Sequence, residues 1–289
     1  MAVTTFVPQV WGAAVLTALS ESLTYGSERC TNRDYDGDVS EYGGSVKITT
    51  AGDVTIGDYT AYVPYTPAQA STTTVDLPIN QRKFWNFMLD DVDRAQVRND
   101  GDLIGKLSAR AAHQLRNTAD KYVAAQMAAG VAVGNQIAEQ TIAPTAFVDA
   151  YDKVLLPLRQ KLSDASVPTE GRFLVVTPAF HNLLLKDSRF IAAGDGTSAE
   201  VRQNGYVGRA AGFDIFETTA ANAPDGPGAG AGKLIVAGHP SATTYAEQIS
   251  KVEAVRMTDR FTDQMRGLHM YGALVIRPTA LATADVVVS

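Results

Sequence analysis

Residues 24–76 contain no leucine, and no phenylalanine or tryptophan occurs between Trp11 and Phe84. A span of this length without large apolar side chains cannot build a hydrophobic core of its own. It nevertheless carries many valines, isoleucines and threonines and six tyrosines, which favour strands. We therefore expect a strand-rich arm that must lie on another surface, and a neighbouring copy of the same chain is the surface that we favour.

The overall composition predicts a folded, soluble protein. Of the 289 residues, 45% are hydrophobic, which suffices for one or two domains with a sizeable core. The net charge of −6 without a basic run argues against a dedicated nucleic-acid binder, though not against a container that holds nucleic acid. Cys30 is the only cysteine, so we expect no intrachain disulfide and a reducing compartment. The sequence shows neither a secretory signal nor an apolar run long enough for a membrane helix.

The first part of the chain predicts an apolar segment followed by strands. Residues 9–23 have the apolar spacing of a short amphipathic helix, which packs either on its own domain or on another subunit. Alternating residues after 44 and again over 81–89 predict strands, and residues 64–74 predict a loop tip. We interpret the strands as one arm that runs out and back.

The rest of the chain mixes helices and strands, which indicates an α+β fold. Apolar residues at steps of three or four predict a helix over 102–127, roughly 40 Å long. A second helix is predicted over 145–163, which Pro157 should kink or split, and a third with Thr177 as its N-cap. Strands are predicted at 172–176, 213–217, 233–237 and 242–246, and a long hairpin at 251–261 and 267–277 that turns through 262–264.

The segment Asn32–Val39 copies part of a calcium-binding loop. Asn32, Asp34, Asp36 and Gly37 stand at the matching positions, but the position of the bidentate glutamate holds Gly43. A turn in which these side chains bond their own backbone is therefore the default interpretation.

Other candidate sites for chemistry are weaker. The glycines at 226, 228, 230 and 232 precede Lys233, but Pro227 and Leu234 stand where a phosphate loop needs Gly and Ser or Thr, so we expect a flexible surface loop. The four histidines are scattered, and His113 is expected to be solvated. Asp90, Asp91 and Asp93 are read as a charged turn before a helix. No nucleophile, base and orienting group stand out, which favours a non-enzyme.

Four segments, in this order, resemble the major capsid protein of tailed double-stranded DNA bacteriophages. Residues 32–39 resemble the turn before its extended loop, and Asp90–Gln96 resembles the acidic entry to its spine helix. Residues 167–178 resemble the first strand-to-helix step of its axial domain, and residues 205–213 the glycine pair before the next strand.

The resemblance implies an α+β protein with a Hong Kong 97-like capsid fold. Its implied parts are an N-terminal arm at 1–40, an extended loop or β-arm at 41–89, a peripheral domain with the spine helix at 90–143, an axial domain at 144–250, a peripheral β-hairpin at 251–277 and a C-terminal strand returning to the axial domain at 278–289.

The implied function is a structural one, with no catalytic residues, no cofactor and no metal. The subunit would self-assemble through hexamers and pentamers into the icosahedral shell around a phage genome, in the bacterial host cytoplasm, and remain in the virion. Separate scaffolding, portal and decoration proteins are possible partners, packaged DNA is contacted non-specifically, and no membrane is involved. Subunit contacts are expected at Phe6, Trp11, Leu16, Lys47, Tyr59, Tyr62 and Tyr65.

Three questions stay open on the sequence alone. Some relatives crosslink a lysine of the extended loop to a neighbouring asparagine, and Lys47 is the only lysine before residue 83, but no matching asparagine motif is found. An encapsulin-type nanocompartment shell of the same fold, which holds a cargo enzyme, is one alternative. A metal-binding module or enzyme that uses the Asp-rich turn is the other.

Overall fold

The computed structural model describes residues 23–35, 45–51, 56, 58–59, 61–62, 72–90, 100–187, 208–259 and 261–289. The elements, in chain order, are β1 (Ser45–Ala51), β2 (Thr72–Pro78), β3 (Gln81–Asp90), α4 (Asp100–Gly130), η2 (Val133–Asn135), β4 (Gln136–Ile142), η3 (Ala150–Leu155), α5 (Leu156–Asp164), β5 (Phe173–Val176), α6 (Pro178–Lys186), β6 (Arg209–Ala210), β7 (Phe213–Glu217), β8 (Lys233–Gly238), η4 (Pro240–Ala242), β9 (Thr243–Arg256), β10 (Thr262–Val275), η5 (Pro278–Ala280) and β11 (Leu281–Val288).

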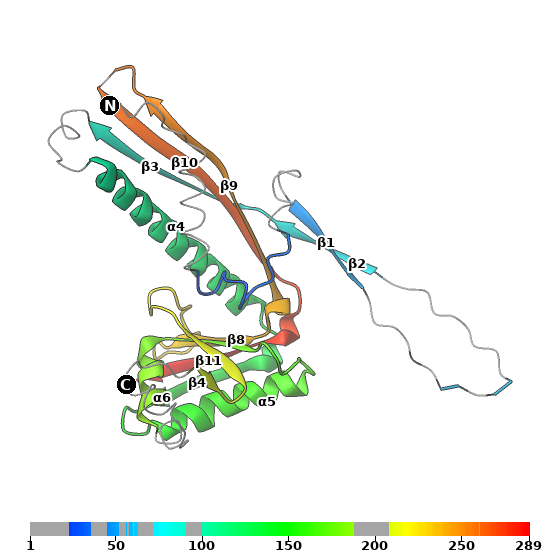
Figure 1. Cartoon of the computed structure of the whole chain (residues 1–289). Coiled ribbons are helices and arrows are strands. Elements are labelled where there is room, and N and C mark those ends of the chain that lie inside the picture. Colours follow the sequence, from blue (N-terminus) through cyan, green and yellow to red (C-terminus); the bar gives the residue numbers. More distant parts are fainter. Residues whose placement is uncertain are drawn as a thin grey trace.

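The described strands form three sheets, and the α+β prediction is confirmed. Figure 1 shows a compact body, built on the largest sheet, from which an elongated limb extends. The limb consists of the sheet β3-β10-β9 with α4 beside it. The pair β1-β2 leaves the limb to the side as a narrow arm.

The long helix α4 connects the limb to the body. It spans Asp100–Gly130, slightly longer than the predicted 102–127, and 31 residues correspond to about 46 Å. Ala112 and Leu115 pack against Trp85 and Met265 of the limb sheet. The last turns belong to the main core, where Met127 is fully buried. One apolar stripe therefore serves two cores in succession.

The predicted hairpin near the C-terminus exists, but its turn was misplaced. The chain turns between Arg256 and Thr262, where Met257 N donates to Thr262 O at 3.1 Å, and not through 262–264. Thr-Asp occurs twice, at 258–259 and 262–263. The first pair forms the turn, because this register places Met265 on the face that packs on α4. The predicted strand at 242–246 is the beginning of the 14-residue β9.

The strand predicted at 81–89 is also present, but it is not the strand by which the arm returns. As β3 it pairs antiparallel with β10, from Gln81↔Tyr271 to Asp90↔Thr262. The returning strand of the arm is β2, which pairs with β1. The interpretation of 41–89 as one arm is therefore wrong for residues 81–89. Trp85 is the reason, because it is buried against α4 instead of being carried outward.

The body is a six-stranded sheet in the order β4-β11-β8-β5-β7-β6. The C-terminal strand β11 lies inside it, parallel to β4 and antiparallel to β8. The strand β4 was not predicted from the sequence. Its residues fall in the range 90–143, which was expected to form the peripheral part, but the structure places them in this sheet. Alternate residues of β4 are only partly buried, so its pattern is that of an edge strand.

The predicted helix at 145–163 is present, but it is not split at Pro157. A π-helical stretch, Ala150–Leu155, passes directly into α5, with helical dihedral angles at Leu155 and Leu156, and Pro157 lies just after this change of winding. The third helix, α6, begins directly after Thr177, but the Thr177 side chain makes no capping hydrogen bond. Val154, Leu158 and Leu184 from these helices are fully buried in the main core.

Candidate functional site

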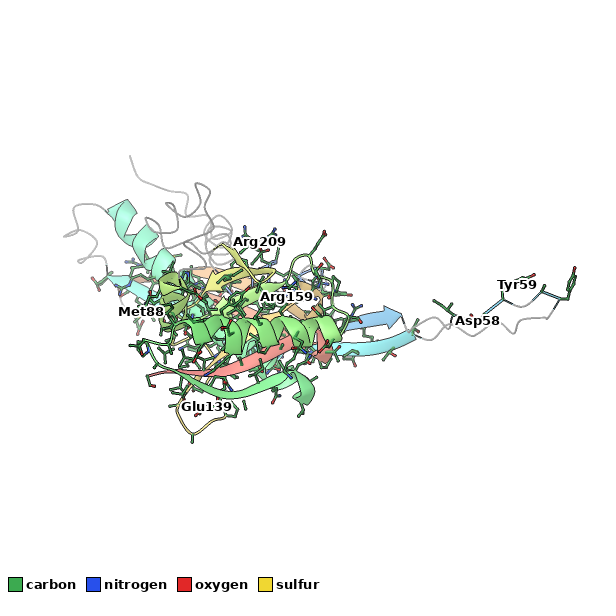
Figure 2. The ribbon with its side chains drawn as sticks, turned by 90° about the horizontal axis from the view of Figure 1, so that it is seen from below. Asp58, Tyr59, Met88, Glu139, Arg159 and Arg209 are labelled. Carbon is green, nitrogen blue, oxygen red and sulfur yellow. The ribbon has the colours of Figure 1, made fainter. Side chains whose placement is uncertain are left out.

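The arm is a two-stranded ribbon whose end is exposed. β1 and β2 pair along their full length, from Ser45↔Pro78 to Ala51↔Thr72. Figure 2 shows Asp58 and Tyr59 far from the body, beyond the end of this ribbon. Tyr59 is 85% exposed, and Ile56 and Tyr62 are more exposed still. The arm thus presents apolar and aromatic side chains that the described part of its own chain does not cover.

The base of the arm, in contrast, is covered by its own chain. Val46, Ile48, Leu77 and Ile79 are buried and pack together with Ala246 of β9. The prediction that the whole span 24–76 needs an outside partner is therefore wrong for the base of the arm. Alternate residues of β1 point toward the limb sheet, and Val46 and Ile48 fill that contact together with Leu77 of β2.

The segment before the arm, residues 23–35, is also held internally. Tyr25 and Cys30 are fully buried in the main core. Asp120 of α4 accepts hydrogen bonds from the backbone N–H groups of Thr24 at 2.9 Å and Gly26 at 3.2 Å. Burial raises the pKa of Asp120 to about 6, although these hydrogen bonds favour the charged carboxylate. Burial likewise raises the pKa of the Cys30 thiol to about 12, which makes it unreactive.

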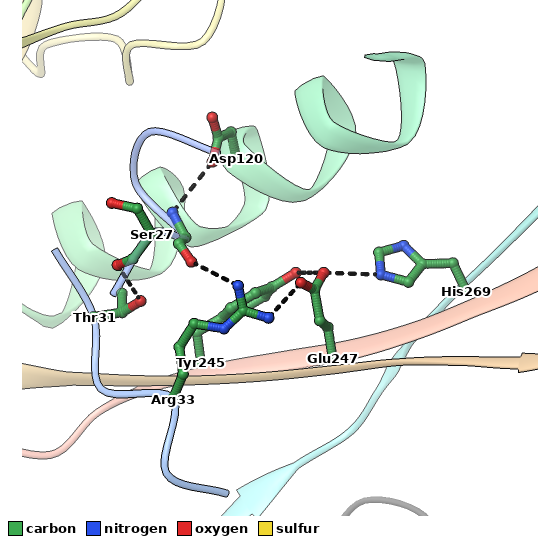
Figure 3. Close-up of polar contacts among 8 residues, drawn as sticks. Ser27, Thr31, Arg33, Asp120, Tyr245, Glu247 and His269 are labelled. Carbon is green, nitrogen blue, oxygen red and sulfur yellow. Dashed lines mark hydrogen bonds and ion pairs between the residues drawn. The ribbon is translucent and has the colours of Figure 1, made fainter. Parts of the chain in front are cut away.

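A buried polar cluster joins this segment to the limb sheet (Figure 3). Glu247 of β9 pairs with Arg33 and accepts hydrogen bonds from Tyr245 Oη at 2.7 Å and His269 Nε2 at 3.1 Å. Burial alone would raise the pKa of Glu247, but the hydrogen bond from His269, the charge of Arg33 and the hydrogen bond from Tyr245 together lower it. Arg33 also lies over the ring of Tyr245, 5.3 Å from its centroid.

This cluster is a clamp and not a reaction centre. The side chains of Glu247 and His269 are 1% and 0% exposed, so no substrate reaches them. The burial of Tyr245 and the negative charge of Glu247 raise the pKa of the Tyr245 hydroxyl well above its usual value, so it stays a hydrogen-bond donor. The contacts of this cluster hold residues 23–35 against β9 and β10.

The calcium-like turn begins as the default interpretation predicts. Asp34 N donates to Asn32 Oδ1 at 2.8 Å, a local Asx turn. The backbone of Asn32 also bonds to β9, through Asn32 N to Thr243 O and Tyr245 N to Asn32 O. Residues 36–40 of the turn lie outside the described residues. In the described ranges, no group of three or more His, Cys, Asp and Glu side chains is placed to hold a metal.

The glycine-rich loop at 226–232 has a different role from that predicted. Its amides serve carboxylates of the same chain: Gly228 N donates to Asp285 Oδ2 at 2.9 Å and Gly230 N to Glu139 Oε2 at 2.8 Å. A Cβ at Gly226 would lie 1.9 Å from Asp285 Oδ1. The loop is thus packed onto β4 and β11 and is not a loose surface loop. Glycine is required for space, and no helix follows that would offer amides to a phosphate.

The histidines lie in separate places. His113 is exposed on α4, as predicted, beside Asn117. His181 pairs with Glu217 at the edge of the body, and His239 Nδ1 lies 2.8 Å from Ser241 Oγ. Each of these three makes a local contact of its own.

The limb sheet has an exposed apolar face that sequence reasoning missed. Phe84 of β3 is 75% exposed on the face opposite to α4, and Met88, Val255 and Phe261 are exposed as well. A shallow groove on this face is lined by Phe84 and by the ion pair of Arg266 with Glu253. The signal was available, because β3 carries apolar residues on both of its faces, which indicates a strand covered on both sides.

The predicted subunit contacts fall into two groups. Lys47, Tyr59 and Tyr62 are exposed on the arm, and Lys47 stands opposite Asp76 in the ribbon. The structure thus brings these three onto one element. The remaining predicted contacts lie outside the described residues, as does the helix predicted at 9–23: Phe6, Trp11, Leu16 and Tyr65. Within the described part of the chain, no helix has the length and apolar character to span a membrane.

Comparison with known proteins gives a consistent result. A family described as "Phage capsid protein" matches residues 74–284. A structure from Mycobacterium phage Che8 is 32% identical and has a TM-score of 0.69, with 91% of each chain covered. No curated protein matches the chain.

Two further structures share the fold at lower identity. The capsid of cyanophage P-SCSP1u is 18% identical with a TM-score of 0.64, over 86% of this chain and 84% of its own. The mature capsid of bacteriophage PhiM1 is 16% identical with a TM-score of 0.64, over 88% and 87%.

Proposed function

Because the chain belongs to the phage capsid protein family, we propose that it builds its shell from hexamers and pentamers in which each arm lies on a neighbouring subunit. As a phage major capsid protein with a Hong Kong 97-like fold, it is a structural subunit of the virion shell. The sequence-based predictions of the fold and of the shell function are confirmed. The encapsulin-type nanocompartment is not favoured, since the family and the similar structures named above are those of phages.

The observation that carries the proposal is the contrast between the two ends of the arm. Its base is buried against β9 and β10, so the arm has a defined origin. Its end exposes Tyr59 and Tyr62, which are large, amphipathic and suited to a protein interface. A ribbon that is fixed at one end and uncovered at the other is built to reach another molecule.

The finer parts of the predicted function belong to the same proposal. The limb would be the peripheral domain, and the six-stranded body the axial domain around which hexamers and pentamers close. Scaffolding, portal and decoration proteins would be separate partners, packaged DNA would be contacted without sequence preference, and assembly would take place in the host cytoplasm. The subunit would carry out no catalysis and need no cofactor or metal. Many modest contacts repeated around the shell would sum to a stable assembly.

The register of the arm provides a sharp test. Ala51 stands opposite Thr72, so residues 52–71 can be replaced by an Asn-Gly turn that closes β1 and β2 as a tight hairpin. This variant keeps the buried base of the arm and removes its end. We expect a folded, soluble subunit with the thermal unfolding curve of the wild type, and no closed particles in electron micrographs.

The control is a change on the exposed side of the ribbon base, Thr49→Ser, which leaves the length of the arm unchanged. It should assemble like the wild type. Closed particles of normal shape from the arm-shortened chain would refute the proposed role of the arm.

A further inference from the structure

The direction of the arm is decided over two residues. Pro78, the last residue of β2, pairs with Ser45 of the arm, whereas Gln81, the first of β3, pairs with Tyr271 of the limb sheet. Only Ile79 and Asn80 separate the two strands. The chain therefore changes its hydrogen-bonding partner here, and we call Ile79–Asn80 the bend because the arm departs from the limb sheet at these two residues.

One side of the bend rests on a glycine. Gly272 follows Tyr271 on β10, and a Cβ at this position would lie 2.2 Å from the carbonyl oxygen of Pro78 and 3.0 Å from its carbonyl carbon. These atoms belong to the backbone, so no side-chain rotation can make room. Gly272 does not adopt a positive φ, which means that glycine is required here for space and not for conformation.

The other side of the bend is held by the spine helix. Tyr122 of α4 donates a hydrogen bond from its hydroxyl to Asn80 Oδ1 at 3.0 Å. The Tyr122 ring packs edge-on against Tyr271, with 5.6 Å between the ring centroids. Ile79 is only 7% exposed and belongs to the buried base of the arm. The bend is thus fixed between β10, α4 and the base of the arm.

We propose that the contact between Gly272 and the Pro78 carbonyl sets the angle at which the arm leaves the subunit, and that this angle sets the curvature with which subunits join. The first half rests on the geometry of one chain. The second half rests on the proposed function of the arm. Gly272 and Asn80 are positioning residues, because their role in this proposal is to orient the arm rather than to form a contact between subunits.

The arm is long enough that a small shift at its origin displaces its end by a larger distance. To accommodate a methyl group at Gly272, the chain at Pro78 must move by about 1 Å. β2 extends about 23 Å from this point at about 3.3 Å per residue, and the arm continues beyond it. A shift of this size at the bend therefore becomes a displacement of several ångströms at the end of the ribbon.

The first test measures the arm angle in unassembled subunits of the full chain. Spin labels at Thr73→Cys on β2 and Gln114→Cys on α4 are both at exposed positions, and the buried Cys30 will not react. We expect Gly272→Ala to shift the mean distance between the labels by several ångströms. An unchanged distance in a folded Gly272→Ala subunit would overturn the proposal.

Two glycines supply matched controls. A Cβ at Gly267, on the same strand, would meet the Trp85 side chain at 2.5 Å, so Gly267→Ala strains the limb core without touching the bend. A Cβ at Gly134 would have no atom within 4 Å, so Gly134→Ala should be neutral. Neither control should move the labels, and a shift in Gly267→Ala equal to that in Gly272→Ala would attribute the effect to general strain and refute the assignment.

The second test measures the particles. Gly272→Ala should give shells of altered diameter, or open sheets, where both controls give normal shells. Normal shells from a subunit with a shifted arm would overturn the link to curvature. If the wild-type chain itself formed no particles, the proposed function would fail, whereas the label distances would still decide the role of the bend.

A milder variant keeps the test valid if Gly272→Ala does not fold. Tyr122→Phe removes the hydrogen bond to Asn80 and retains the ring against Tyr271. We expect a broader distribution of label distances with the same thermal midpoint within a few degrees. A distribution as narrow as that of the wild type would contradict the role given to the bend.

Discussion

The two large sheets of the subunit are covered to different extents. In the six-stranded body, β5 is buried along its whole length, and helices α5 and α6 contribute to the same core. The three-stranded limb sheet is covered by α4 on one face and exposes Phe84 and Met88 on the other. The described core of the body is thus packed within one chain. The limb and its arm carry apolar surface that the described part of the chain leaves open, as expected for a subunit of a larger assembly.

The largest effect on the stability of the subunit should come from the core of the body. Phe173 of β5 is 1% exposed, and Phe173→Ala removes a large side chain from a packed core. We expect a loss of about 3–5 kcal/mol in the free energy of unfolding, measured by urea denaturation of the unassembled subunit. Phe84→Ala, the same change on the open face of the limb, should alter it by less than about 0.5 kcal/mol.

Phe84→Ala should affect particle assembly, although it hardly changes the stability of the subunit. The Phe84→Ala subunit should fold normally and yet form fewer closed particles, because it loses an apolar group offered to a neighbour. A large loss of subunit stability in Phe84→Ala would show that the chain itself covers this face. It would contradict the proposed difference in coverage between the two sheets.

A buried and an exposed ion pair on the same strand allow a second comparison. Glu247 is buried with Arg33 and His269, whereas Glu253 pairs with Arg266 at the surface. Glu247→Ala removes the buried carboxylate that Arg33, Tyr245 and His269 share and should lower the free energy of unfolding by about 3 kcal/mol. Glu253→Ala should cost less than about 1 kcal/mol. Equal effects in the two variants would mean that the buried clamp contributes nothing beyond a surface pair.

The pH dependence of stability should reveal Asp120. Its pKa is raised to about 6 in the folded subunit, against about 3.9 in an unfolded chain. The folded state therefore binds the proton more tightly, and stability increases as the pH falls from about 7 toward about 4, by up to about 3 kcal/mol. The lowered pKa of Glu247 has the opposite sign and removes stability only as the pH falls through that lowered value.

The measurement compares wild type with Asp120→Asn by urea unfolding at about pH 4.5 and about pH 7. Asn cannot titrate, so the difference in stability between the two proteins should change in favour of the wild type as the pH falls. A difference that is the same at both pH values would contradict the assignment of this titration to Asp120.

Much of the architecture could be predicted from the sequence because local signals agreed with the final fold. The stripe of α4 and the apolar run of β5 each determine their element locally. The exposed end of the arm agrees with the expectation from the leucine-free span, although Tyr25 of the same span is buried in the main core.

The errors concern partners, which no local pattern specifies. The alternation at 81–89 predicted a strand correctly, but it could not tell pairing with β10 from pairing within the arm. The glycines at 226–232 suggested a loose loop because the carboxylates that they enclose, Glu139 and Asp285, lie far away in the sequence. Tyr25 and Cys30 were assigned to an uncovered span, although α4 covers them from almost a hundred residues later.

Hydrogen exchange by mass spectrometry, on free subunits and on assembled shells, tests the central claim most directly. The claim is that the core of the body is packed within one chain and that the end of the arm is covered by a neighbour. We predict that the amides around Tyr59 and Tyr62 become protected only in the shell, whereas those of β5 are protected equally in both. Arm amides that exchange as fast in closed shells as in free subunits would contradict it.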